Sequence, residues 1–96
     1  MGEIQVTSAT LRSKAEELTS LNAQFKSAVE SLRSDESSLR SQYVGESSDT
    51  FHAAFTKDTI QMDNFYNAIE QYAQKLLQIA DTYEKAEQTS ISIASS

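Results

Sequence analysis

The 96-residue chain contains no cysteine, no proline, no tryptophan and only two glycines. Without cysteine, disulfides and thiol chemistry are excluded, so the stability of the fold has to come from packing. Without proline, the one residue that can interrupt a long helix is Gly45, since Gly2 lies at the N-terminus. Aromatic residues make up only 8% of the chain, which leaves little material for a thick core in one small domain. We therefore expect partners to supply part of the core.

Positive charge is also scarce, because 8 Lys and Arg residues face 14 Asp and Glu residues, a net charge of −6. An acidic chain without a basic cluster repels phosphate backbones and anionic lipid headgroups, so nucleic acid is not an expected partner. The N-terminal segment has neither a basic nor an apolar stretch of the secretory type, and no run reaches the roughly 18 apolar residues of a membrane span. By these signals alone we expect a cytosolic protein.

A seven-residue repeat of large apolar side chains runs through the first half of the chain. Such a repeat is typical of helices in coiled coils and bundles. A weaker companion row consists of smaller and polar residues. The strong row is Ile4, Leu11, Leu18, Phe25, Leu32 and Leu39, and the weak row is Ser8, Ala15, Asn22, Val29, Glu36 and Tyr43. The repeat predicts a helix over about 7–43 with this apolar stripe buried.

The second half repeats the pattern with heavier side chains. Its two rows are Phe55, Met62, Ile69, Leu76 and Tyr83, and Phe51, Asp58, Phe65, Tyr72, Ile79 and Ala86. This stripe is wider than one facing helix can cover, so a second neighbour is needed. The sequence predicts an all-α fold, an antiparallel two-helix hairpin that pairs into a four-helix bundle dimer. Helix two is expected over about 49–88, followed by a flexible tail over 89–96, where β-branched residues and Ser replace good helix formers.

A turn is expected over 44–48, between the two helical patterns. Gly45 tolerates the left-handed backbone that often ends a helix. Ser47 or Ser48 can cap the second helix, and Asp49 suits the positive dipole end of its first turn. Tyr43, directly before the turn, is expected to pack its ring on Phe51.

Association is predicted to depend on apolar rows in the middles of the helices. The expected dimer and core packing residues are Leu18, Phe25, Val29 and Leu32, which face Phe65, Ile69, Tyr72 and Leu76. Exposed charges are predicted to tune only the register, since exposed ion pairs usually contribute less than about 1 kcal/mol.

Few residues suggest chemistry. Glu36 and Asp58 both fall in seam rows at similar heights and superficially resemble a catalytic carboxylate pair, but we interpret them, like Asn22, as polar seam residues that set the register near solvent. His52, the only histidine, is interpreted as an exposed helix residue. No glycine-rich phosphate loop, nucleophile elbow or zinc spacing occurs, so the sequence predicts no catalytic residue, metal, cofactor or small-molecule substrate.

Two short motifs carry a resemblance to a known family. Tyr43-Val44-Gly45 lies midway along the chain, and Tyr83-Glu84-Lys85-Ala86-Glu87 lies near its C-terminus. In an acidic, cysteine-free hairpin of this length, the combination resembles the WXG family of early secreted antigenic target (ESAT)-like proteins. Tyr43 stands where the family motif has Trp.

The resemblance implies a four-helix-bundle dimer that is exported without a cleaved signal peptide by the type VII (ESX) secretion system. The implied partners are an identical chain or a paralogous hairpin, and the type VII secretion ATPase. Tyr83 and Glu87 would form the export signal, together with the turn residues Tyr43 and Gly45 of the paired subunit. The alternatives are a cytosolic coiled-coil adaptor and, less favoured, a hydrolase that uses Glu36 and Asp58.

Overall fold

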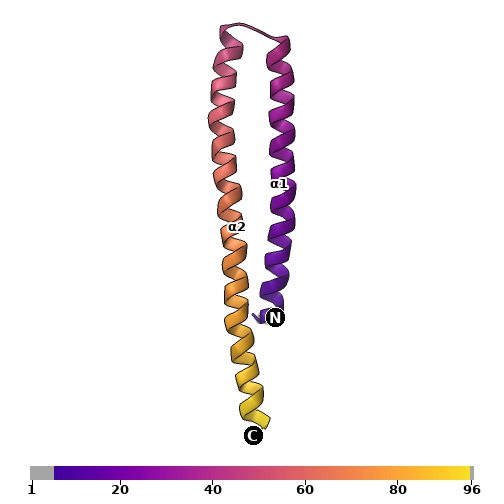
Figure 1. The fold of residues 1–96 in the computed structure, drawn as a ribbon, viewed down its shortest axis with the longest axis vertical. Coiled ribbons are helices and arrows are strands. Elements are labelled where there is room, and N and C mark those ends of the chain that lie inside the picture. Colours follow the sequence, from indigo (N-terminus) through magenta and orange to yellow (C-terminus); the bar gives the residue numbers. More distant parts are fainter. Residues whose placement is uncertain (1–5, 96) are drawn as a thin grey trace, which may run out of the picture.

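Two long α-helices form the computed structural model, which describes the backbone of residues 6–95 and the side chains of residues 6–89. Helix α1 spans Ser8–Gln42 and α2 spans Glu46–Ser95. The two helices run antiparallel and side by side, joined by one tight turn (Figure 1). The result is a rod with extents of 77 × 25 × 20 Å. The predicted all-α hairpin is confirmed.

Helix α1 begins at a capping box made by two threonines. The Thr7 hydroxyl accepts from the backbone N–H of Thr10 at 3.2 Å, and the Thr10 hydroxyl accepts from the backbone N–H of Thr7 at 2.9 Å. These bonds satisfy donors that a helix start otherwise leaves without partners. The helix therefore begins within one residue of the predicted position. Ile4, the first member of the leucine-rich row, lies outside the described residues.

The turn consists of Tyr43, Val44 and Gly45, and it is shorter than predicted. Gly45 has a φ of +138°, a conformation that favours glycine, but it precedes α2 directly instead of ending α1. Its carbonyl accepts the first bond of α2, from the N–H of Asp49 at 3.0 Å. The predicted serine cap is wrong, because α2 already begins at Glu46 and the Ser48 hydroxyl donates to the carbonyl of Tyr43 at 2.8 Å.

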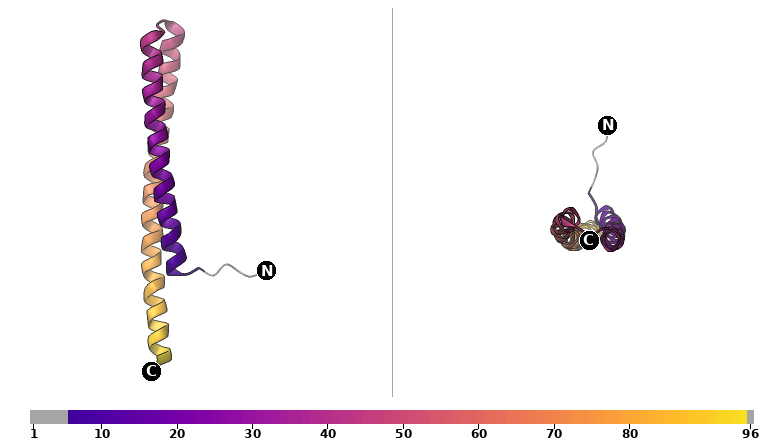
Figure 2. Two further views of the ribbon diagram at one scale, coloured as in Figure 1. Left: turned by 90° about the vertical axis from the view of Figure 1, so that its right-hand side faces the viewer. Right: turned by 90° about the horizontal axis from the view of Figure 1, so that it is seen from above.

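Helix α2 does not end near residue 88. It continues to Ser95, beyond the N-terminal end of α1, so its last turns have no neighbouring helix (Figures 1 and 2). Residues 89–95 are helical, whereas the sequence predicted a flexible tail over 89–96. Ser96 lies outside the described residues. Weak helix formers cost only tenths of a kcal/mol each, and no proline or glycine interrupts the hydrogen bonds. The Thr89 hydroxyl also donates back to the Lys85 carbonyl at 2.9 Å.

The seam between the helices is built from the weak row of α1. All five buried residues of α1 belong to it: Ser8, Ala15, Asn22, Val29 and Glu36. They face an equally spaced row on α2 in which Thr59, Ala73 and Ala80 are buried. Small side chains allow the helices to approach closely. The expectation that the leucine row would be buried is therefore wrong for the single hairpin, because Leu32 and Leu39 are about half exposed.

Candidate functional site

One side of the seam is closed by ion pairs between the helices, and we call it the polar face. Three arginines of α1 each reach an acidic residue of α2. The pairs are Arg12 with Asp81 at 2.9 Å and Glu84 at 3.0 Å, Arg33 with Asp63 at 2.7 Å, and Arg40 with Asp49 at 3.2 Å. The hydrogen bond to Asp81 and the nearby charge of Glu84 raise the pKa of Arg12 above its ordinary value. The arginines therefore act across the helices and fix the register of this face.

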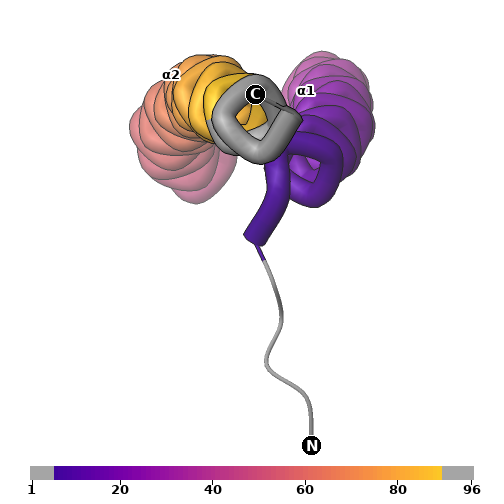
Figure 3. The backbone as a smooth tube through the Cα atoms, turned by 90° about the horizontal axis from the view of Figure 1, so that it is seen from below, coloured from indigo at the N-terminus to yellow at the C-terminus, as the bar shows by residue number. Residues whose placement is uncertain are grey.

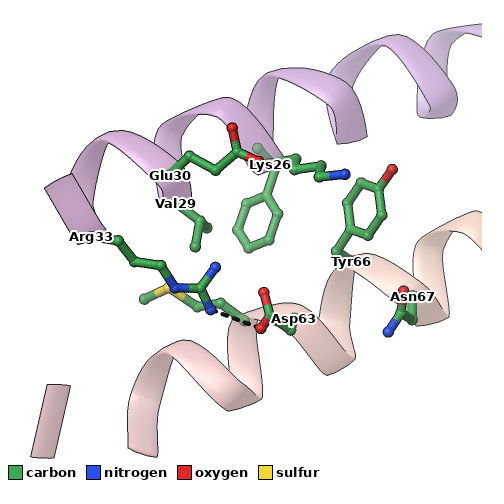
Figure 4. A pocket seen from close by; sticks show the side chains of 9 residues that line it. Lys26, Val29, Glu30, Arg33, Asp63, Tyr66 and Asn67 are labelled. Carbon is green, nitrogen blue, oxygen red and sulfur yellow. Dashed lines mark hydrogen bonds and ion pairs between the residues drawn. The ribbon is translucent and has the colours of Figure 1, made fainter. Parts of the chain in front are cut away.

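A pocket of about 300 Å³ lies on the polar face near the middle of the hairpin (Figure 4). Lys26 and Tyr66 stand on one side of it, with the Lys26 ammonium 5.3 Å from the centre of the Tyr66 ring. On the other side, Arg33 binds both Asp63 and the carbonyl of Thr59, the latter at 3.3 Å. Because these charged groups already bind one another or a neighbouring ring, the pocket offers a ligand few free polar groups.

Asn22 forms the polar centre of the seam. Its amide donates to the carbonyl of Tyr66 at 3.0 Å and to the carboxylate of Glu70 at 2.8 Å. Asn22 is 3% exposed, and both bonds are part-buried. A shift by one helical turn would separate the amide from these partners. The contacts agree with the register role that the sequence suggested for Asn22.

Glu36 and His52 form a second polar contact close to the turn. The two Glu36 oxygens lie 2.8 and 3.0 Å from Nδ1 of His52. The interpretation of His52 as a merely exposed residue is wrong, because its ring covers a carboxylate whose residue is only 7% exposed. Glu36 and Asp58, which were expected at similar heights along the hairpin, do not form a pair. Asp58 is exposed, and Glu36 binds His52 instead. Helix phase turns Asp58 away from the seam.

The opposite side of the seam carries large apolar side chains, and we call it the apolar face. On each helix these residues lie about 60° to 100° from the seam row, on the side away from the ion pairs. Phe25 and Phe65 meet here edge to face, with ring centres 5.5 Å apart. The face comprises Leu11, Leu18, Phe25, Leu32, Leu39, Phe55, Met62, Phe65, Ile69, Tyr72, Leu76 and Ile79. Many members remain exposed, among them Leu32 at 46%, Phe65 at 56% and Tyr72 at 59%.

Seven of the eight predicted packing residues lie on the apolar face, and only Val29 is buried in the seam. Exposed members of the apolar face occur on both helices, among them Leu32 and Leu39 on α1 and Phe65, Tyr72 and Ile79 on α2. An exposed apolar face of this kind is typical of a surface that another protein covers.

The turn presents a second exposed apolar group. Tyr43 is 64% exposed and Val44 is 91% exposed. The predicted packing of Tyr43 on Phe51 is wrong within the hairpin, because Phe51 stacks on Phe55 instead, with ring centres 6.2 Å apart. Tyr43 is therefore largely exposed at the closed end of the hairpin.

The open end of the hairpin contains the C-terminal motif. Tyr83 is 40% exposed. Glu87 accepts a bond from the backbone N–H of Ser8 and another from the Ser8 hydroxyl, each at 3.0 Å. Glu87 is exposed overall but binds the start of α1, and the contact with Ser8 was not predicted from the sequence. Folding the chain about Gly45 places these two residues at similar heights, but only the helix phase shows that they meet.

The part of the chain that the structure describes contains neither a membrane span nor a metal cluster. Neither helix is long and apolar enough there to cross a membrane. Within the same residues, no three His, Asp or Glu side chains gather as a group that could hold a metal ion.

Comparison with known proteins identifies the family. Residues 3–88 match WXG100, described as proteins of 100 residues with WXG. An ESAT-6-like protein of Streptococcus agalactiae is 30% identical over 95 residues, covering 99% of this chain and 96% of that protein.

Solved structures of the secreted protein EsxB from Bacillus anthracis have the same fold. One form matches with a TM-score of 0.81 and 24% identity, over 91% of this chain and 99% of EsxB. The wild-type protein in another crystal form matches with a TM-score of 0.80 and 25% identity, over 88% and 97% of the two chains. By the match over residues 3–88 and the streptococcal relative, this chain belongs to the WXG100 family of ESAT-6-like proteins.

Proposed function

We propose that this protein is a small secreted helical hairpin, a substrate of a type VII (ESX) secretion system, and that it acts through protein–protein interaction as a dimer. Family membership supports the proposal, as does the likeness to EsxB, which is described as a secreted protein. Export then requires no cleaved signal peptide, and the exported chain has the same mass as the cellular one. We assign it no catalytic residue.

The observation that carries the dimer is the uncovered apolar face. Each large side chain that becomes fully buried contributes about 1.5–3 kcal/mol, and this face offers many of them along the whole rod. A second hairpin of equal length covers such a stripe from end to end. The polar face is already closed by its own ion pairs, so the apolar face is the side that pairs, and the product is a four-helix bundle. The second hairpin is an identical chain or a paralogue.

Recognition by the secretion machinery is proposed to use Tyr83 and Glu87. They are spaced by four on α2, so a ring and a carboxylate lie on one helix face and can be read together by the type VII secretion ATPase. Tyr43 and Gly45 of the paired hairpin contribute to the same surface in a bundle of antiparallel hairpins. The exposed ring of Tyr43 supports this role, because the hairpin itself makes little use of it.

Export is tested by measuring the protein in cells and in culture fluid, with and without the secretion ATPase. We expect the protein in the fluid only when the ATPase is present, with an intact mass equal to that of the cellular form. Tyr83→Ala and Tyr43→Ala should each reduce export while helicity and dimerisation are kept. A protein that stays in the cells of a strain with an active system would instead favour the cytosolic adaptor.

A further inference from the structure

The start of α1 contacts α2 inside the proposed export signal. Ser8 is the first residue of α1, and Glu87 lies 79 positions later on α2. Ser8 donates its backbone N–H to Oε1 and its hydroxyl to Oε2, so both oxygens of the carboxylate are held by α1. Ser8 itself is only 9% exposed. The contact is therefore specific, since one residue supplies both donors.

The start of α1 needs this carboxylate. The first N–H groups of a helix have no partner within the helix. The capping box of Thr7 and Thr10 provides acceptors for the N–H groups of those two residues, but it provides none for the N–H of Ser8. Glu87 takes this donor, and its negative charge also suits the positive end of the helix dipole. Hydrogen bonds to a charged group are stronger than neutral ones, so the carboxylate has one preferred position.

Glu87 remains available to a partner while it is held. An ionised carboxylate has about four acceptor positions, and Ser8 occupies two of them. The residue is exposed overall, and Tyr83 stands one turn earlier, so a basic side chain beside an apolar hollow would complement the pair. A partner that binds a fixed carboxylate does not have to order a flexible glutamate side chain. Binding is tighter because this entropy cost is avoided.

We propose that Ser8 is a positioning residue of the export signal, so that the signal is built from the start of α1 together with Tyr83 and Glu87. This inference rests on the proposed function of Tyr83 and Glu87. The ligand class is a protein surface that presents Lys or Arg next to an apolar pocket.

The sharpest test is Ser8→Pro in the full-length protein. Proline lacks both donors and is well tolerated at the first position of a helix. Thr7, with φ −121° and ψ 166°, already has the extended backbone that a residue before proline requires. The variant therefore releases Glu87 without breaking α1. Thr10→Ala is the matched control, because it weakens the first turn and leaves both bonds to Glu87. Ser8→Thr restores both donors.

The readout is the ratio of exported to cellular protein, together with the melting temperature of each purified variant. We expect Ser8→Pro to lower the ratio about ten-fold and Ser8→Thr to give the wild-type ratio. Thr10→Ala should leave the ratio unchanged, although its melting temperature should be similar to that of Ser8→Pro. Normal or increased export of Ser8→Pro, with export lost in Glu87→Gln, would overturn the positioning role and leave the signal itself intact. Normal export of Glu87→Gln would overturn the signal and this inference with it. Equal losses of export in Ser8→Pro and Thr10→Ala would show that Ser8 supports the fold and does not position the signal.

Discussion

At the residue scale, the polar side chains of the seam each have a defined partner. Asn22 uses its amide on Tyr66 and Glu70, and Glu36 is held by His52. A thin hairpin buries few large apolar groups, so a polar group in its seam is close enough to the opposite helix to find a partner there. Such pairs favour one register, because any slip leaves a buried polar group without its bond.

The contact between Glu36 and His52 gives a prediction about stability. We expect His52→Ala to lower the free energy of unfolding by about 1–3 kcal/mol, because the buried carboxylate loses its partner. The double variant Glu36→Ala/His52→Ala should lose less than the sum of the two single variants, since it leaves no carboxylate without a partner. Urea denaturation of all four proteins measures this, and strictly additive losses would show that the two residues are not coupled.

At the element scale, the turn decides how the two helices are joined. Three residues reverse the chain, and the last of them has a positive φ of 138°. Gly45 also accepts the first bond of α2, so one residue both reverses the chain and starts the next helix. A tight turn of this kind keeps α1 and α2 in contact from the closed end onward, and it leaves the side chains of Tyr43 and Val44 exposed.

Gly45→Ala is expected to destabilise the protein by about 1–3 kcal/mol through the backbone alone. A Cβ at this position meets no atom within 4 Å, so steric crowding contributes nothing. Val44→Ala, at a side chain that is 91% exposed, is the neighbouring control and should change stability by less than about 0.5 kcal/mol. Thermal and urea unfolding of both variants provide the comparison. Equal stability of Gly45→Ala and wild type would mean that the turn rearranges without strain.

At the scale of the whole molecule, the hairpin has two different sides. The polar face is held together by pairs between the helices, and the apolar face leaves several of its large side chains exposed. Seen along the rod, the two helices twist about each other (Figure 3). The large apolar side chains that can bind a partner thus lie beside the seam and not in it. An acidic chain with small residues in its seam can therefore still associate.

Dimerisation is therefore expected to depend on apolar contacts and to vary little with salt. Phe65→Ala should weaken the dimer at least about ten-fold, because Phe65 is 56% exposed in the hairpin and the second chain is expected to bury it. Asn67→Ala, two residues along and on the side of the polar face, is the control and should leave the dimer unchanged. Sedimentation or light scattering at low and high salt measures both effects. A loss of association by orders of magnitude at high salt would show that charge drives pairing.

Much of this protein was determined by its sequence alone. The seven-residue repeats specify two helices, and the lack of proline leaves Gly45 as the only interruption. The width of the apolar stripes indicates that a hairpin alone cannot cover them. The motifs around Tyr43 and Tyr83 led to the family, which the comparisons confirm.

Only the tertiary structure decided which row of each helix faces the other. Hydrophobicity points to the leucine row, but the helices approach most closely where side chains are small, so Ala15, Ala73 and Ala80 are buried in the seam and the leucines remain beside it. The pairs Glu36 with His52 and Ser8 with Glu87 depend on that phase and on the exact register. Residues far apart in the chain meet only when each helix has the correct rotation about its own axis. A seven-residue repeat specifies an apolar stripe, but it does not specify which edge of that stripe faces the other helix.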